Sequence, residues 1–166
     1  NVAGEYVYDG ALYACQSDDA KQRRSKRAVW GMAAILTVAV AAGGCIPAPG
    51  MQNCFYVLLP YLGEFLGAAS VIWALAKLGT DWGTVREYNY KKSVAVLPVR
   101  TAVTAVFSGL GIVCELIFFF VNDHAGQTFF ALLYVLLKLI ALLSVLVLRA
   151  EIMQAEWDKL PKKNNF

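Results

Sequence analysis

Histidine and charged side chains are scarce in this chain, and their scarcity limits the chemistry it can perform. Among its 166 residues there is one histidine, His124, and Asp, Glu, Lys and Arg together make up 16%. The sequence has no metal-ligand cluster, no nucleophile–base set and no glycine-rich phosphate loop. We therefore expect neither a metal nor a cofactor, and an enzyme is less favoured than a transport, binding or structural protein. The basic residues do not share a face with stacking aromatics in a folded module, which argues against a nucleic-acid partner.

Hydrophobic residues, in contrast, are abundant and gathered into long blocks. They make up 58% of the chain, whereas soluble domains contain about 45–50%. Four blocks are long enough to supply the roughly 20 apolar residues with which a helix crosses a bilayer. These blocks lie at about residues 28–44, 55–78, 98–121 and 127–148. The sequence therefore predicts an all-α integral membrane protein, a four-transmembrane-helix bundle in a lipid bilayer.

The polar residues before the first apolar block have the features of a helix start. Ser17 is a good N-cap, and the two aspartates after it lie in the first turn, where the helix dipole favours negative charge. We expect one helix from about Ser17 to Gly44, because Gly43, Gly44 and Pro47 end it. The four-helix membrane domain then covers residues 17–160.

Shorter segments precede and follow this membrane domain. Residues 1–16 alternate aromatic and polar side chains, which allows either a short hairpin arm with a turn at Asp9-Gly10 or a disordered segment. The fourth helix is expected to continue beyond the membrane until Pro161 stops it, so that residues 161–166 form a C-terminal tail.

Lysine and arginine are distributed unevenly among the segments between the apolar blocks. They are dense before the first block, where residues 21–27 read KQRRSKR, and they recur between the second and third blocks and after the fourth. The two remaining loops, at residues 45–54 and 122–126, have none. Because lysine and arginine are enriched in cytoplasmic loops, we expect both termini in the cytoplasm and the protein in the plasma (inner) membrane.

The loop of residues 79–97, between the second and third blocks, carries helix signals of its own. Thr84 and Glu87 have the spacing of a capping box, and Glu87 and Lys91 are a favourable helical pair. The sequence therefore predicts a short cytoplasmic helix that lies at the membrane interface.

Two cysteines, Cys45 and Cys54, bracket the outer loop CIPAPGMQNC. In an oxidising compartment a disulfide between them is favoured. The span count and the cytoplasmic termini also resemble those of the quinone-coupled four-helix oxidoreductases, a resemblance that implies thiol–disulfide exchange. Those enzymes use a Cys-x-x-Cys pair and a second pair in the other outer loop, whereas here eight residues separate the cysteines and the other loop has none. A membrane thiol oxidoreductase is therefore the least favoured interpretation.

Three charged residues fall inside the apolar blocks: Glu64 in the second, Glu115 in the third and Lys138 in the fourth. At about 1.5 Å per residue, they lie about 13, 9 and 16 Å from the nearest outer loop, respectively. A lysine at the bilayer centre costs about 2.5–3.5 kcal/mol on insertion scales, so a partner is expected. The third and fourth spans must be antiparallel neighbours, which favours an ion pair between Glu115 and Lys138, with Glu64 as a third member.

This charged cluster allows two interpretations. It is either a polar clasp that fixes helix order, or a site for a cation, a proton or a polar substrate, since two carboxylates and one ammonium leave a surplus negative charge. We expect a transport protein or an accessory subunit of a transporter or membrane complex. The alternative is a structural or interaction protein in which the cluster is only a clasp.

Small residues indicate close helix packing. Gly63 and Gly67 form a GxxxG motif, and Ala105 with Gly109 extends a small-residue stripe in the third span. They serve contacts either within a monomer or with a second copy or a partner membrane subunit.

Overall fold

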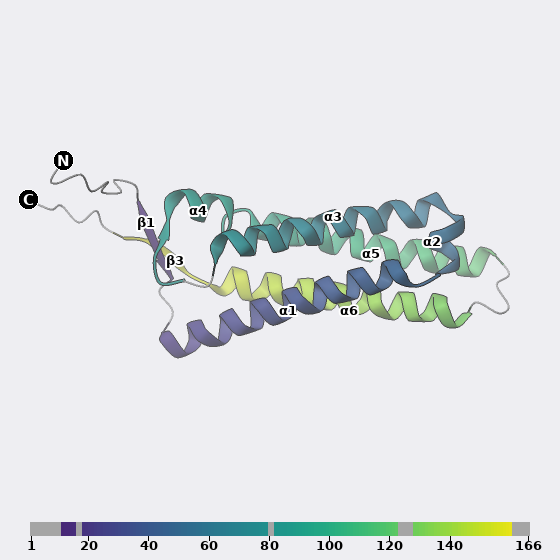
Figure 1. The fold of residues 1–166 in the computed structure, drawn as a ribbon, viewed down its shortest axis with the longest axis horizontal. Coiled ribbons are helices and arrows are strands. Elements are labelled where there is room, and N and C mark those ends of the chain that lie inside the picture. Colours follow the sequence, from purple (N-terminus) through teal and green to yellow (C-terminus); the bar gives the residue numbers. More distant parts are fainter. Residues whose placement is uncertain (1–10, 16–17, 80–81, 123–127, 161–166) are drawn as a thin grey trace, which may run out of the picture.

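The computed structural model describes residues 11–15, 18–79, 82–122 and 128–160. Within these ranges the chain is mostly helical, and four long helices pack side by side as a bundle (Figure 1). The long helices are α1 (Asp19–Cys45), α3 (Phe55–Leu78), α5 (Leu97–Val121) and α6 (Thr128–Gln154). Two short helices, α2 (Pro49–Asn53) and α4 (Glu87–Lys92), lie in connections at opposite ends of the bundle.

Three short strands form a small antiparallel sheet at one end of the bundle. They are β1 (Leu12–Cys15), β2 (Val85–Arg86) and β3 (Trp157–Lys159), in the order β2-β1-β3. The central strand β1 pairs its Tyr13 with Val85 on one side and with Lys159 on the other. We call this end of the bundle the sheet end, and the opposite end, where α2 lies, the α2 end (Figure 1).

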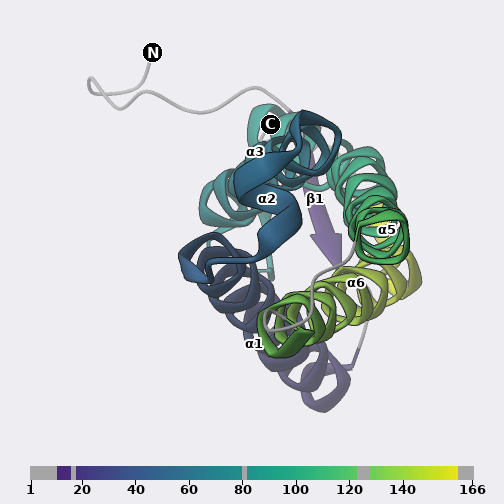
Figure 2. The same ribbon diagram turned by 90° about the vertical axis from the view of Figure 1, so that its right-hand side faces the viewer.

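The long helices follow a simple order around the bundle axis. In Figure 2, which looks along the bundle, α1 lies beside α6, α6 beside α5 and α5 beside α3. The contact between α1 and α3 is smaller. One hydrophobic core lies near the sheet end and includes Val29, Leu75 and Leu97, and a second, further along the bundle, includes Leu36 and Val145.

Aromatic rings connect the sheet with the helices. Tyr13 of β1 stacks on Tyr90 of α4, with ring centroids 4.1 Å apart. The ring centroid of Trp157 in β3 lies 6.0 Å from that of Tyr90 and 6.1 Å from that of Trp82. These contacts and the two neighbouring strands stabilise β1, which would be marginal as part of an isolated hairpin.

The sheet corrects the prediction of an all-α fold. β1 lies in the N-terminal segment for which the sequence allowed a hairpin arm or disorder, and the proposed turn at Asp9-Gly10 lies outside the described residues. The predicted helical continuation to Pro161 is wrong, because α6 ends at Gln154 and the chain then forms β3. The physical reason is tertiary: β3 finds a partner strand in β1 and a ring contact for Trp157.

The connection between α3 and α5 agrees with its prediction in part. Glu87 and Lys91 of α4 form the expected ion pair, at 2.7 Å. The predicted capping box with Thr84 is wrong, because β2 occupies Val85–Arg86 and α4 has no side-chain hydrogen bond at its N-terminus. Glu87 instead donates its backbone N–H to the carbonyl oxygen of Ala11, at 3.0 Å.

The long helices match the four apolar blocks. Within the described residues, four helical stretches are long and apolar enough to cross a membrane: Ala20–Cys45, Phe55–Leu78, Glu87–Val121 and Thr128–Gln154. Their outward faces carry exposed apolar side chains such as Val38, Leu66 and Phe120, the last of them 81% exposed. A helix satisfies its backbone hydrogen bonds internally, so these apolar faces suit contact with lipid.

Candidate functional site

Three charged side chains face the interior of the bundle, one from each of three helices. Glu64 comes from α3, Glu115 from α5 and Lys138 from α6, and none is more than 2% exposed. Ionisable side chains within membrane helices normally face the interior of a bundle, because contact with lipid costs free energy. The apolar residues around each of them occupy the outward faces, so helical periodicity turns the charged side chains inward.

Lys138 forms an ion pair with Glu64. Its ammonium contacts Glu64 Oε2, which connects α6 with α3 across the bundle. The Lys138 Nζ also lies 4.7 Å from the ring centroid of Tyr61 and 5.2 Å from that of Tyr134. Cation–π contacts contribute about 2 kcal/mol or more when they are desolvated. The lysine charge is therefore balanced by one carboxylate and two ring faces.

This pairing corrects the prediction that Lys138 pairs directly with Glu115. Gly111 precedes Glu115 by one helical turn on the same face of α5. A Cβ added at Gly111 would lie 3.5 Å from Lys138 Cε and from Nζ. The lysine side chain therefore passes α5 where that helix has no side chain, and it reaches Glu64 on the next helix. Although α5 is the neighbour of α6, this does not decide which carboxylate pairs with Lys138, because the long lysine side chain extends past α5.

Glu115 is buried against α2 instead. Its carboxylate lies beside the backbone of Gly50, and a side chain at Gly50 would occupy the same space. α2 crosses the end of the bundle (Figure 2), so the short helix covers this carboxylate. Neither Glu115 oxygen has a hydrogen bond of acceptable geometry with any described residue. Glu115 is thus a separate carboxylate, near the ion pair but outside it.

Buried polar atoms without a partner surround the ion pair. Within the described part of the chain, they are Glu64 Oε1, both carboxylate oxygens of Glu115 and the Tyr134 hydroxyl. Leaving a buried donor or acceptor unsatisfied costs about 1–3 kcal/mol. Oxygen atoms are the ligands that hard cations prefer, and carboxylates also accept protons. The arrangement can therefore hold a monovalent cation, a protonated amine or a proton.

A polar face of α5 leads to Glu115 and was not identified from the sequence. Thr101, Thr104 and Ser108 recur at spacings of three and four residues, and all three are 0% exposed. The two threonines donate to backbone carbonyls one turn earlier in α5. Ser108 donates to the carbonyl oxygen of Lys138, at 3.3 Å. Hydroxyl residues at helical spacing within an apolar block were the signal that could have revealed this inward face.

The predicted packing residues have different surroundings. A Cβ at Gly67 would lie 2.6 Å from Thr104 Oγ1 and 3.3 Å from Thr104 Cα, and a Cβ at Gly63 would overlap an aromatic ring of α5. The GxxxG motif therefore permits close contact between α3 and α5 within the monomer. Ala105 packs against the second hydrophobic core, whereas an added Cβ at Gly109 would meet nothing within 4 Å.

Cys45 and Cys54 are free thiols in the structure, which does not contain the predicted disulfide. Cys45 is the exposed last residue of α1, and Cys54 lies between α2 and α3. The loop between them contains the short helix α2, with Pro49 in its first turn. Proline is favoured at the start of a helix. Pro49 therefore begins α2, whereas Pro47 follows the end of α1.

Neither a metal-binding cluster nor a similar known protein identifies the chemistry of the site. In the residues that the structure describes, no group of three or more His, Cys, Asp or Glu side chains is placed to hold a metal ion. Comparison of the chain with protein-family models, curated proteins and solved structures finds no match, so the chemistry of the site is interpreted from its own residues.

Proposed function

We propose that this chain is a membrane transport protein, or an accessory subunit of a membrane transport complex, that takes up a cation or a proton at Glu115 and Glu64. The observation that carries the proposal is the fully buried carboxylate of Glu115, which forms no ion pair with a described residue and has no side-chain hydrogen bond from one. A structural clasp needs one acid and one base, and Glu64 with Lys138 already supplies both. The second acid adds a negative charge that a cation or a proton would neutralise.

The surroundings of Glu115 support the uptake of a cation or a proton by this carboxylate. Taking a charge out of water without a counter-charge costs several kcal/mol, so an incoming cation or proton would be bound favourably. On one side, α2 and its Gly50 cover the carboxylate, and a small displacement of this short helix would open it to the α2 end. On the other side, the hydroxyl face of α5 extends from Glu115 toward the sheet end.

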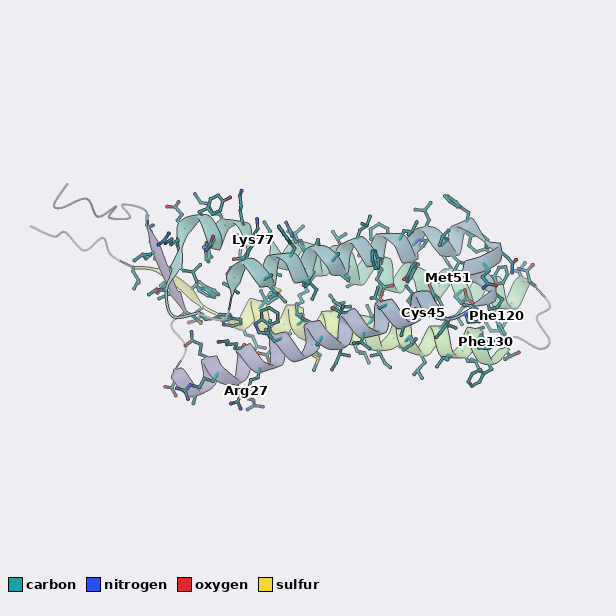
Figure 3. All side chains as sticks on the ribbon, viewed as in Figure 1. Arg27, Cys45, Met51, Lys77, Phe120 and Phe130 are labelled. Carbon is teal, nitrogen blue, oxygen red and sulfur yellow. The ribbon has the colours of Figure 1, made fainter. Side chains whose placement is uncertain are left out.

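In the proposed orientation, the sheet end faces the cytoplasm and the α2 end faces outward from the plasma (inner) membrane. Figure 3 supports it, because Arg27 and Lys77 lie toward the sheet end, and Cys45, Met51 and Phe120 lie toward the α2 end. Lysine and arginine are enriched on the cytoplasmic side of membrane helices. The strands β1 and β3 both belong to the sheet end, so both termini would be cytoplasmic.

Reconstitution into lipid vesicles tests this function. We expect the wild-type protein to move protons or monovalent cations down an imposed gradient, followed with dyes inside the vesicles. Glu115→Gln should abolish the flux while its helical content, measured by circular dichroism, stays unchanged. Glu87→Gln is the matched control, since it removes the same charge from the short helix α4, outside the bundle. For an accessory subunit, the equivalent readout is a cation-dependent rise in the Tm of the detergent-solubilised protein, which Glu115→Gln should remove.

The second candidate is a structural or interaction protein that binds a second copy or a partner membrane subunit. The Glu64–Lys138 pair favours it, because Glu64, Tyr61 and Tyr134 already balance the lysine charge. If wild type and Glu115→Gln show the same flux and the same cation response, the transport proposal is wrong and the clasp remains. The thiol oxidoreductase stays an untested prediction and the least favoured one.

A further inference from the structure

A pocket opens at the sheet end, beside the first turns of α1. Its volume is about 240 Å³, and its walls come from α1, from the last turns of α6 and from Trp82. Lys21 and Arg24 lie on the α1 wall, and Glu151 lies on the α6 wall. Figure 1 shows the first turns of α1 diverging from α3 and α4. This part of α1 is therefore accessible from the membrane surface.

Positive charge dominates this pocket. Neither Lys21 nor Arg24 forms an ion pair with another residue that the structure describes. Glu151, the acid of the lining, accepts a hydrogen bond from Ser25 Oγ at 2.8 Å. A second hollow on the same turns of α1 is lined by Arg24 and two further arginines. Because the basic side chains exceed the acid, the pocket favours an anion.

Trp82 supplies an independent sign of a ligand. Trp82 is only 4% exposed, and its indole Nε1–H has no acceptor among the described residues. A buried indole N–H usually finds a hydrogen-bond partner. Since Trp82 lines the same pocket as Lys21 and Arg24, an anionic oxygen bound there would provide that acceptor.

The position of the pocket along α1 indicates the source of the anion. The apolar part of α1 begins at Ala28, and at about 1.5 Å per residue Arg24 and Lys21 lie about 6 Å and about 10 Å beyond it. The headgroup layer extends roughly 5–8 Å beyond the hydrocarbon core on each side. Basic clusters next to a membrane helix bind anionic lipids. We propose that this pocket binds the phosphate group of an anionic phospholipid, with Lys21 and Arg24 as the charged ligands and Trp82 as a donor.

A lipid titration of the full chain in a neutral detergent tests this site. Dioleoylphosphatidic acid is expected to raise the Tm by several degrees, whereas zwitterionic dioleoylphosphatidylcholine is not. Lys21→Gln with Arg24→Gln should weaken binding of the anionic lipid about 30-fold, from the contribution of two basic residues near an anionic surface. Both side chains are exposed, so this double variant should retain the fold. Lys91→Gln with Lys92→Gln removes the same charge from α4, outside the pocket, and should bind as the wild type does.

Two further measurements make the test specific. Trp82→Phe keeps a ring in the core but removes the indole N–H, so the lipid-induced rise in Tm should shrink even where the lipid-free Tm also changes. Millimolar inorganic phosphate should produce no rise in Tm; a rise equal to that with phosphatidic acid would replace the lipid site with a site for a free anion. Equal responses to both lipids, or an unchanged response of the Lys21→Gln, Arg24→Gln variant, would overturn the proposal.

Discussion

Replacing Lys138 with methionine removes the ammonium and leaves the Glu64 carboxylate buried without a counter-charge. Glu64 is 0% exposed, and its Oε1 already lacks a partner among the described residues. Removing one partner of a buried pair costs about 3–5 kcal/mol, because the remaining charge is not compensated. Methionine keeps the apolar stem of the lysine but loses the cation–π contacts with Tyr61 and Tyr134. We therefore expect Lys138→Met to lower the free energy of unfolding by about 3–5 kcal/mol.

The double variant Lys138→Met, Glu64→Leu separates the loss of the pair from the cost of the stranded charge. Replacing both partners of a buried pair with apolar side chains is often neutral or stabilising, so the double variant should recover most of the loss. Titration from mild detergent into a denaturing detergent, followed by circular dichroism, gives the free energies of wild type, both single variants and the double variant. The expected coupling energy is at least as large as the loss in Lys138→Met, about 3–5 kcal/mol, because the double variant removes both buried charges together.

The control is the same cycle with Glu115 in place of Glu64. The sequence-based pairing predicts the stronger coupling between Lys138→Met and Glu115→Leu, whereas the structure predicts that this coupling is the weaker of the two, because the ion pair is with Glu64. Additive effects of Lys138→Met and Glu64→Leu would refute the assigned ion pair. Stronger coupling in the control cycle than in the Glu64 cycle would restore the pairing inferred from helix adjacency.

Three other outcomes follow from the same structure. Gly67→Ala should lower the free energy of unfolding in the detergent titration by about 1–3 kcal/mol, because the added methyl meets Thr104. Gly109→Ala is the control and should be neutral or slightly stabilising. Equal losses in the two variants would contradict the packing assigned to α3 and α5. In a cysteine-free background, Met51→Cys should react with a membrane-impermeant maleimide from outside the cell and Lys92→Cys only after permeabilisation, and the reverse pattern would invert the orientation. The thiol count of the purified, denatured protein should be the same before and after reduction, and an increase of two on reduction would reinstate the disulfide.

The long helices were predictable because the membrane allows few alternatives. A chain that crosses hydrocarbon must satisfy its backbone hydrogen bonds internally, so each long apolar block predicts a helix. The block at 55–78 coincides with α3, and the helix expected from about Ser17 to Gly44 differs little from α1. The sheet was not predictable from local signals, because its strands come from three distant segments. Short strands such as Val85–Arg86 become stable only when their partners are brought beside them.

The charged residues of the site were predictable, but their pairing was not. A charge within an apolar block is visible in the sequence, which identified Glu64, Glu115 and Lys138 together. Their pairing depends on the order of the helices and on Gly111, whose missing side chain lets the lysine pass α5. The position of Gly50 against Glu115 depends on α2, a short helix that was not predicted because its segment reads as a loop with two prolines. The position of each charge within an apolar block was visible in the sequence, whereas its contacts required the packed structure.

Glu115 is the residue that distinguishes a clasp from a ligand site. A bundle that requires only stability gains little from a buried carboxylate without an ion-pair partner of its own, and leucine would remove a poorly satisfied group that costs about 1–3 kcal/mol. We therefore expect Glu115→Leu to raise the free energy of unfolding, whereas Glu64→Leu should lower it by stranding Lys138. Residues that reduce stability are characteristic of functional sites. If Glu115→Leu is more stable than the wild type and has lost the flux or the cation-dependent rise in Tm, the carboxylate serves ligand uptake. If Glu115→Leu destabilises the protein as much as Glu64→Leu does, the carboxylate has a structural partner and the proposed cation site is wrong.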